Sequence, residues 1–242
     1  MLIASKKLVK TAKVFSFVLC IALLFSVLST PVFATQTRTY NSGRLNQLST
    51  YDGFWLRGTL PTLNPNWTSG TENKINYEFW FNINNSSSAW VEMGYHKGYD
   101  WNTDGSANTS SSYNGCFTAK ATSSSWDLVK LSSLNWNAGQ SHTMGVELYS
   151  SYFCDIRSDG TAWLSWINTT TSNTGSIDAG LEWGVSNGAS QSISLPSSMT
   201  DLNTRVSGTW KTWSSIGGVY TSNSHSGVTA TFDSANNKIN FN

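Results

Sequence analysis

Short runs of alternating apolar and polar residues recur along this chain, and Gly, Asn and Ser residues separate them. No stretch carries the i, i+3, i+4, i+7 apolar spacing of an amphipathic helix. The alternating runs are Phe54–Leu60, Ile75–Ile83, Ala89–His96, Gly115–Ala121, Trp126–Leu134, His142–Ser150, Tyr152–Arg157, Thr161–Asn168, Ser176–Ser186, Thr209–Ile216, Val228–Asp233 and Lys238–Phe241. Many short strands with polar turns predict an all-β protein, an antiparallel two-sheet β-sandwich that forms a single domain.

Four stretches depart from this alternation. Residues 195–206 are the one helix-friendly segment, although Pro196 begins it poorly. Asp159-Gly160 and residues 234–237 have the composition of tight turns between paired strands. The Gly-, Ser- and Asn-rich segment Lys97–Asn114 shows no alternation. We therefore expect a long loop there, and loops of this length are usually either functional or disordered.

The first 34 residues have the three parts of a secretory signal. Four lysines precede an uncharged apolar run from Val14 to Leu28, and Val32 and Ala34 supply compact side chains before a cleavage point. The alternative is a membrane anchor, but the apolar run is shorter than the roughly 20 residues that span a bilayer. We expect residues 1–34 to be removed, and residues 35–242 to be secreted as an extracellular domain, either free or associated with the cell wall.

The charge balance of the exported chain limits the classes of partner that it can bind. The whole chain has 15 Lys and Arg residues against 14 Asp and Glu residues, and four of the lysines precede the cleavage point. The exported part therefore carries 11 basic side chains against 14 acidic ones. This is not the basic footprint of a nucleic-acid-binding protein, and no second long apolar run follows. We expect neither nucleic acid nor membrane as a partner, and the oligomeric state stays open.

The cysteines predict a disulfide rather than a metal site. Cys116 and Cys154 remain after cleavage, and such a pair readily forms a disulfide in an oxidising compartment. Neither has a second Cys or His at a zinc-ligand interval, and the three histidines are scattered. We expect no metal site and no cofactor, while Asp100 and Asp104 leave a structural calcium ion open.

One pair of runs could place acidic and aromatic side chains on a common face. In the run 75–83 the apolar side chains share one face, which leaves Glu78 and Trp80 on the other. If residues 89–96 form a hairpin with this run, Trp90, Glu92 and His96 join that second face. Indoles beside carboxylates suit a sugar-binding cleft, and two carboxylates also suit hydrolysis. The alternative is that the tryptophans belong to the core and the acids to a solvated face.

Later segments hold further candidate ligand contacts. They are Trp101, Glu147, Glu182 and Trp183. Gly180 and Gly184 flank Glu182 on its face of the expected strand and leave room above it, either for a ligand or for another backbone. The alternative for such a glutamate is a solvated position at the rim of the sheet.

Two of these runs resemble a known group of peptidases. Trp90-Val91-Glu92-Met93-Gly94-Tyr95 and Ala179-Gly180-Leu181-Glu182-Trp183-Gly184 are similar to the glutamic peptidase type of sandwich, which includes the eqolisins and the neprosin-like proteins. The resemblance implies a secreted, concanavalin-like jelly roll with Glu92 and Glu182 as the catalytic pair on one concave sheet. In such a pair one carboxylate activates water and its partner steadies the tetrahedral oxyanion. The chain also resembles small secreted bacterial β-proteins that carry no assigned activity.

The sequence therefore supports three functional hypotheses. The first is an extracellular protein that binds polysaccharide or cell-wall glycan through an aromatic and acidic concave sheet face. The second is a glutamic-type peptidase, or another two-carboxylate hydrolase, that acts through Glu92 and Glu182. The third is a non-catalytic surface or matrix protein. The partner is a glycan in the first and a glycan or polypeptide in the second.

Overall fold

Strands make up most of the structure. The computed structural model describes residues 36–242 except 47, 49, 83–88, 122–124, 151–152, 168–174 and 187. The predicted signal, residues 1–34, lies outside the described residues, so its cleavage stays a prediction. From Gln36 to Asn242 the chain forms one compact unit. Within the described residues, no helix has the length and apolar character needed to cross a membrane.

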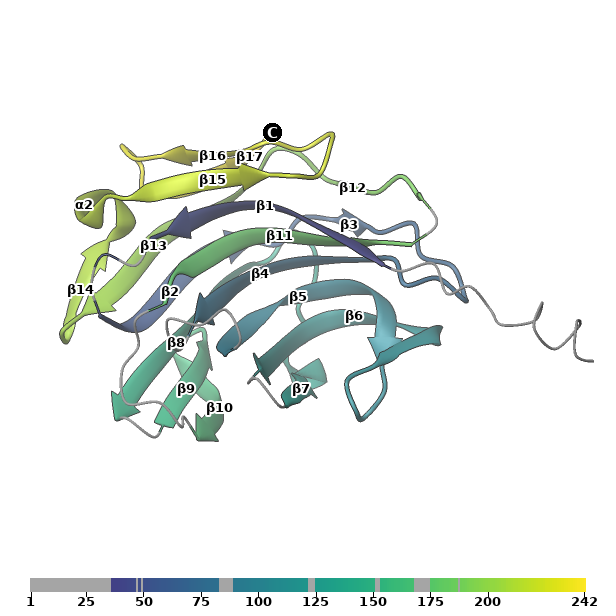
Figure 1. Cartoon of the computed structure of the whole chain (residues 1–242), viewed down its shortest axis with the longest axis horizontal. Helices are drawn as coiled ribbons and strands as arrows, with labels where there is room; N and C mark the ends of the chain where they lie inside the picture. Colours follow the sequence, from purple (N-terminus) through teal and green to yellow (C-terminus); the bar gives the residue numbers. More distant parts are fainter. Residues whose placement is uncertain are drawn as a thin grey trace, which may run out of the picture. The chain divides into compact units, whose positions relative to one another are not determined.

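Two large antiparallel sheets form a sandwich, as the alternation predicted (Figure 1). Across the described residues, the seven-stranded sheet contains, in spatial order, β15 (Val219–Asn223), β1 (Thr37–Leu45), β11 (Ile177–Val185), β4 (Lys74–Asn82), β5 (Trp90–Trp101), β6 (Ala107–Ala121) and β7 (Trp126–Lys130). The eight-stranded sheet contains β10 (Thr161–Ile167), β9 (Phe153–Ser158), β8 (Ser141–Ser150), β2 (Tyr51–Thr59), β13 (Ser197–Val206), β17 (Lys238–Phe241) and β16 (Ala230–Asp233), with β14 (Thr209–Thr212) beside β13. The short strands β3 (Leu63–Asn64) and β12 (Ser192–Ile193) pair separately, and α2 (Trp213–Ile216) and the 3-10 turn Ser132–Leu134 complete the described elements.

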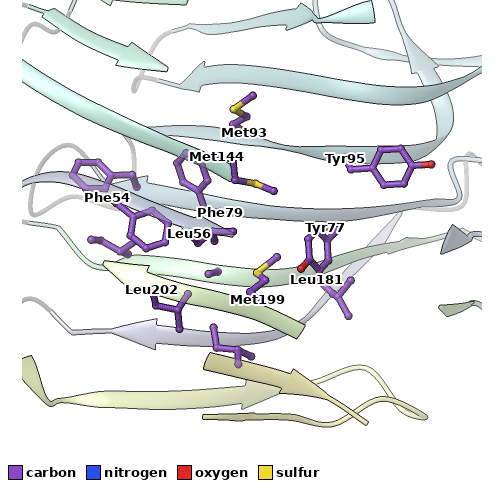
Figure 2. Close-up of a cluster of buried hydrophobic side chains, with 14 of the residues drawn as sticks. Phe54, Leu56, Tyr77, Phe79, Met93, Tyr95, Met144, Leu181, Met199 and Leu202 are labelled. Carbon is purple, nitrogen blue, oxygen red and sulfur yellow. The ribbon is translucent and has the colours of Figure 1, made fainter. Parts of the chain in front are cut away.

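The core lies between the two sheets. Strand β4 sends Tyr77 and Phe79 inward, and Phe54 of β2 meets the Phe79 ring edge-on with 5.3 Å between centroids (Figure 2). All three side chains are fully buried. Each buried aromatic or aliphatic side chain of this size contributes about 2 kcal/mol to folding. Because alternate residues of a strand point to opposite faces, this inward set fixes which residues of β4 point outward.

Most of the helix-friendly segment 195–206 forms a strand. Residues 197–206 are β13, which pairs with β2 on one side and with β17 and β14 on the other. The register with β2 shifts between Thr200 and Asn203, and Asp201 within this bulge has a φ of 54°. The bulge adds a residue between the inward side chains Met199 and Leu202. That extra residue interrupts the alternation of inward and outward side chains. For this reason the sequence of the segment resembled that of a helix.

The expected long loop at Lys97–Asn114 is mostly strand. Strand β5 continues to Trp101 and β6 begins at Ala107, so only residues 102–106 connect them. Tyr99, Trp101 and Phe117 form a second, smaller core here, against which Trp126 packs. Polar residues dominate this hairpin because much of β6 before Gly115 is exposed to solvent, so the alternation was too weak to predict it.

Two predicted turns are confirmed and the predicted disulfide is not formed. Asp159 and Gly160, with φ angles of 50° and 79°, connect β9 to β10, and residues 234–237 turn between β16 and β17. Cys116 lies in β6 of one sheet and Cys154 in β9 of the other, and both are buried thiols. The disulfide prediction rested on compartment and number alone, which do not specify how two sheets bring side chains together.

Candidate functional site

The outer face of the seven-stranded sheet carries the predicted acidic and aromatic set. Strands β4 and β5 pair as expected, with Trp80 opposite Glu92 and Asn76 opposite His96. Residues directly opposite each other share a face, so these side chains all point away from the core. On the other side of β4, Glu182 of β11 lies opposite Asn76. The hairpin prediction is therefore confirmed, and β11 adds Glu182 to the same face.

A cleft of about 800 Å³ opens on this face. Its aromatic lining consists of Tyr40, Trp80, Trp90, Tyr99, Trp101, Trp126 and Tyr220. Its charged lining consists of Arg38, Arg44, Lys74, Glu92, Asp178 and Glu182. A volume of this size is typical of a ligand site. The cleft thus combines aromatic rings with acidic and basic side chains.

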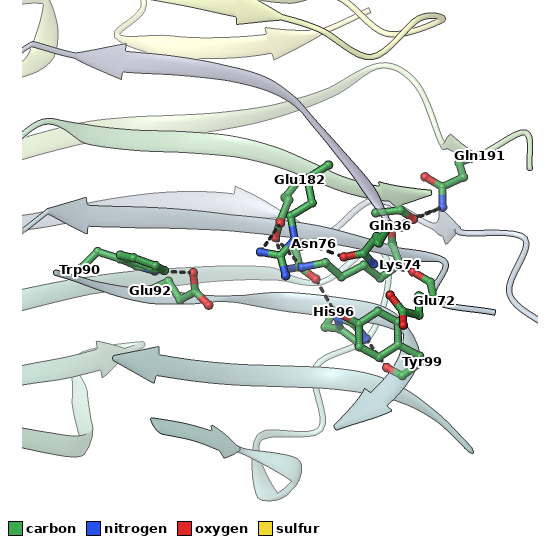
Figure 3. A network of polar contacts seen from close by, with 12 residues as sticks. Gln36, Glu72, Lys74, Asn76, Trp90, Glu92, His96, Tyr99, Glu182 and Gln191 are labelled. Carbon is green, nitrogen blue, oxygen red and sulfur yellow. Dashed lines mark hydrogen bonds and ion pairs between the residues drawn. The ribbon is translucent and has the colours of Figure 1, made fainter. Parts of the chain in front are cut away.

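Glu182 is held as a carboxylate by two basic side chains. Its Oε2 accepts hydrogen bonds from Lys74 Nζ at 2.5 Å and from Asn76 Nδ2 at 3.0 Å (Figure 3). Arg38 lies 3.4 Å from its Oε1. Burial by itself would raise the pKa of Glu182, but Lys74 and Arg38 together bring it below the ordinary value. Glu182 is therefore ionised at mildly acid pH.

A short chain of polar contacts orients Asn76 towards Glu182. The buried His96 places Nδ1 2.7 Å from Asn76 Oδ1 and Nε2 2.8 Å from the carbonyl oxygen of Tyr99 (Figure 3). The Trp101 ring packs on His96 with 4.1 Å between centroids. Burial and the nearby Lys74 lower the pKa of His96 well below its usual value. A neutral His96 carries a single N–H and donates to only one of these two oxygens. It lies beneath the cleft beside the Asn76 amide that donates to Glu182.

Glu92 has the opposite protonation preference. It is 7 % exposed, and its Oε2 accepts a 3.0 Å hydrogen bond from Trp90 Nε1 (Figure 3). Burial and the negative charge of Glu182 raise the pKa of Glu92 to about 7. Glu92 therefore stays protonated in the mildly acid range in which Glu182 is already ionised.

Glu78 is a third carboxyl group, fully buried between the other two. On β4 it lies one step along the same face from Asn76 and from Trp80, so Glu182 and Glu92 are its diagonal cross-strand neighbours. Such neighbours have Cα atoms roughly 7–8 Å apart. Neither oxygen of Glu78 makes a well-formed hydrogen bond among the described residues, and the polar groups that act on it most closely include Asn76 and Glu182. Burial, then Glu92 and Glu182, raise its pKa well above the ordinary value, so Glu78 is protonated.

The candidate ligand contacts Glu78 and His96 are fully buried and do not line the cleft, and two further candidates lie elsewhere. Trp183 faces the core, where its ring stacks on His225 with 4.0 Å between centroids and its Nε1 donates to Asn41. A side chain that alternates with Glu182 along β11 must point inward, so Trp183 does not contribute to the cleft. Glu147 belongs to β8 in the other sheet, on the face turned away from the sandwich interior.

Several residues of the cleft were not predicted. Lys74, Arg38 and Tyr40 had no motif to mark them, because their roles depend on which strands become neighbours. For Lys74 a weak signal existed: it stands one strand period before Asn76, at the start of a strongly apolar run. Gly180 and Gly184 beside Glu182 make room for neighbouring protein atoms and not for a ligand. A Cβ at Gly180 would meet the backbone of β1, and one at Gly184 would meet Gln36 and Lys74.

No group of three or more His, Cys, Asp or Glu residues that could hold a metal ion occurs within the part of the chain that is described. Asp100, which was left open as a calcium ligand, instead pairs with Lys130 at 2.8 Å. Asp104 accepts hydrogen bonds from the backbone and side chain of Ser106. Asp100 thus links β5 to β7, and Asp104 stabilises the connection between β5 and β6.

The fold is similar to that of solved glutamic peptidases. Scytalido-glutamic peptidase, solved with a peptide-based transition state analog, superposes with a TM-score of 0.55 at 13% identity, over 86% of this chain and 98% of that chain. SCP-B, a member of the eqolisin family of peptidases solved with the tripeptide Ala-Ile-His, gives a TM-score of 0.54 at 13% identity and the same coverage. At this identity the similarity establishes the sandwich fold alone.

Other comparisons add little. CG-16, a homodimeric agglutinin from chicken liver, superposes with a TM-score of 0.32 at 10% identity, over 63% of this chain and 99% of that chain, which is too low to bear on function. No protein-family model and no curated protein matches the sequence.

Proposed function

We propose that the cleft is the active site of a hydrolase that works at acid pH through Glu92 and Glu182. The observation that carries this proposal is the opposite protonation of two carboxyl groups in one cleft. Lys74 and Arg38 keep Glu182 ionised, whereas burial keeps Glu92 protonated up to a pKa of about 7. Environments that push the pKa values of two acids apart are how general acid–base pairs are made.

In the proposed reaction, Glu182 is the base and Glu92 is the acid. The Glu182 carboxylate removes a proton from a water molecule whose oxygen attacks the electrophilic carbon of the substrate. Glu92 donates its proton to the oxygen or nitrogen on which negative charge develops. When the bond to the leaving group breaks, that group departs with one proton and the other product keeps the hydroxyl group of water. Lys74, Asn76 and His96 position Glu182 for this role.

The proposed substrate is a polypeptide. The fold is that of proteins described as glutamic peptidases, one of them solved with a peptide-based transition state analog. The cleft is open, and its lining comes from all seven described strands of one sheet, from β15 to β7. Rings such as Trp80 and Trp90 would accept apolar side chains of an extended peptide. We also propose that the protein acts outside the cell as a mature chain beginning at Thr35.

The test is hydrolysis of casein and of soluble glucans between pH 3 and 8. We expect cleavage of casein that declines above about pH 7, together with a loss of about 100-fold or more in kcat for Glu92→Gln and for Glu182→Gln. Asp178→Asn is the matched control, since this acid lines the same cleft but is paired with Arg44 at 2.6 Å. Equal rates in the wild type and both glutamine variants would remove the assignment.

Binding of glycan without catalysis is the second candidate. The aromatic lining of the cleft favours it, because an indole face accepts the C–H face of a pyranose while amides and carboxylates accept its hydroxyl groups. Retention on insoluble polysaccharide that is lost in Trp90→Ala and kept in Glu182→Gln, without any hydrolysis, would establish this function in place of the first.

A further inference from the structure

A second hollow lies on the outer face of the eight-stranded sheet, whereas the cleft lies on the seven-stranded sheet. It has a volume of about 180 Å³, and its walls include Trp55 of β2, Glu147 of β8, Arg157 of β9 and Trp210 of β14. Trp55 alternates with the core residue Phe54 along β2, so its ring points outward. Trp210 is 38 % exposed. The hollow therefore presents two indole rings to solvent.

Two glycines lie at this hollow. Gly53 lies opposite Glu147, and Gly145 lies between Trp55 and Arg157 in one cross-strand row. The Trp210 ring covers Gly53, where a Cβ would be 3.1 Å from ring carbon Cη2. A Cβ at Gly145 would overlap the carbonyl oxygen of Phe54 and lie 2.7 Å from Trp55 Cβ, so neither position has room for a side chain. Gly145 forms part of the wall of the hollow, and Gly53 lies under the Trp210 ring.

Charged groups of the hollow are fixed by one another. Glu147 Oε2 lies 3.6 Å from Arg157 Nε and 4.0 Å from Arg205 Nη1. Arg205 also bonds to Asp52 at 3.1 Å and lies over the Trp210 ring at 5.6 Å from its centroid. The arginines therefore hold the glutamate and one indole in place.

This chemistry selects a neutral ligand with both apolar and hydroxyl groups. An anion would gain little, since Arg157 and Arg205 already face Glu147 and two aspartates. A purely apolar group would remove these ions from water without replacing their hydrogen bonds, which is costly. A sugar ring can stack its C–H face on an indole and offer hydroxyl groups to the ions.

We propose that this hollow binds one pyranose ring of a neutral glycan. Trp210 and Trp55 would contact the ring faces, and Glu147 and Arg157 would bond to its hydroxyl groups. The proposal is independent of the hydrolase proposed for the cleft, because the two sites lie on different sheets. It would give the protein a means of attachment to polysaccharide while the cleft acts on another molecule.

The test is calorimetric titration with cellohexaose, chitohexaose and xylohexaose. We expect the wild type to bind at least one of them, and Trp210→Ala and Glu147→Gln each to weaken that binding by about tenfold or more. Trp163→Ala is the matched control, since Trp163 is 40 % exposed in the same sheet but does not line the hollow. Circular dichroism checks that each variant keeps its fold.

Three outcomes would overturn the proposal. One is the absence of binding to all three oligosaccharides. Another is binding that Trp163→Ala weakens as much as Trp210→Ala. The third is binding that depends on Trp90 of the cleft and is unchanged in Trp210→Ala, which would assign the glycan to the cleft.

Discussion

Glu78 of β4 lies directly opposite Gly94 of β5, and no side chain larger than hydrogen fits between them. A Cβ at position 94 would overlap Glu78 Cβ and lie 2.7 Å from the carbonyl oxygen of Tyr77. On the other side of β4, Glu78 lies opposite Gly180. Glycines on both neighbouring strands thus allow a fully buried carboxyl group to sit in the middle of the sheet, below the cleft.

Gly94→Ala should destabilise the protein. Because the new methyl group meets main-chain atoms, the strands must move apart, and we expect a loss of about 1–3 kcal/mol in urea unfolding. Gly115→Ala on β6 is the control, since its Cβ would meet the hydroxyl end of Tyr113, which can turn aside. A smaller loss for Gly94→Ala than for Gly115→Ala would contradict this account.

Glu78→Gln should leave the titration of Glu92 unchanged. A protonated Glu78 carries no charge, and glutamine has the same shape and the same neutrality, so the field at Glu92 stays the same. Glu182→Gln, in contrast, removes a charge that raises the pKa of Glu92, so its midpoint should fall below about 7. Carbon NMR of the labelled glutamate carboxyl groups measures both midpoints. A lowered Glu92 midpoint in Glu78→Gln would mean that Glu78 is ionised.

Stability should decrease as the pH rises from about 4.5 to about 7. In this range the folded protein keeps the Glu92 proton, because burial raises the pKa from 4.5 to about 7, while the unfolded chain releases it. The loss should reach about 3 kcal/mol. Urea unfolding followed by tryptophan fluorescence measures it. Glu92→Gln should flatten this part of the profile, and an unchanged slope in that variant would assign the effect to other groups.

Lys74→Met should destabilise the protein more at pH 7 than at pH 4. Without Lys74 the ionised Glu182 is a buried charge that has lost its closest partner, and such losses cost about 3–5 kcal/mol. At acid pH Glu182 can take up a proton, so the variant should regain part of the lost stability. The double variant Lys74→Met/Glu182→Gln is the control and should show no such pH dependence. An equal loss at both pH values would count against an ionised Glu182.

The Cys116 thiol should react only after unfolding. It is 1 % exposed, and burial raises its pKa well above the ordinary value, so the native thiol is neither accessible nor ionised. Alkylation in denaturant without a reducing agent should label Cys116, whereas the native protein should stay unlabelled. Mass spectrometry of the Cys116 peptide decides this, and a peptide that can be labelled only after reduction would restore the disulfide prediction.

The sequence alone determined the fold class and the face on which each residue of a regular strand lies. Alternation has a period of two, so the inward ring of Phe79 settled the outward direction of Glu78 and Trp80 without any tertiary information. The same rule failed at β13, where a bulge interrupts the period, and along the polar hairpin after Tyr99. Local composition also identified the turn at Asp159-Gly160, since both residues accept positive φ angles.

Only the tertiary structure decided which strands lie side by side. Strand order is set by packing between distant segments, so composition and alternation could not show that Glu147 would lie on the other sheet. Only the resemblance to glutamic peptidases implied that Glu182 and Glu92 share a sheet, and it did not give the place of β11 beside β4. Protonation depends on the same neighbours, because the charge of Glu182 rests on Lys74, which is 108 positions away. The sequence identified Trp80, Trp90, Trp101, Glu92 and Glu182 of the cleft. Their chemistry arises from burial and from pairs that folding brings together.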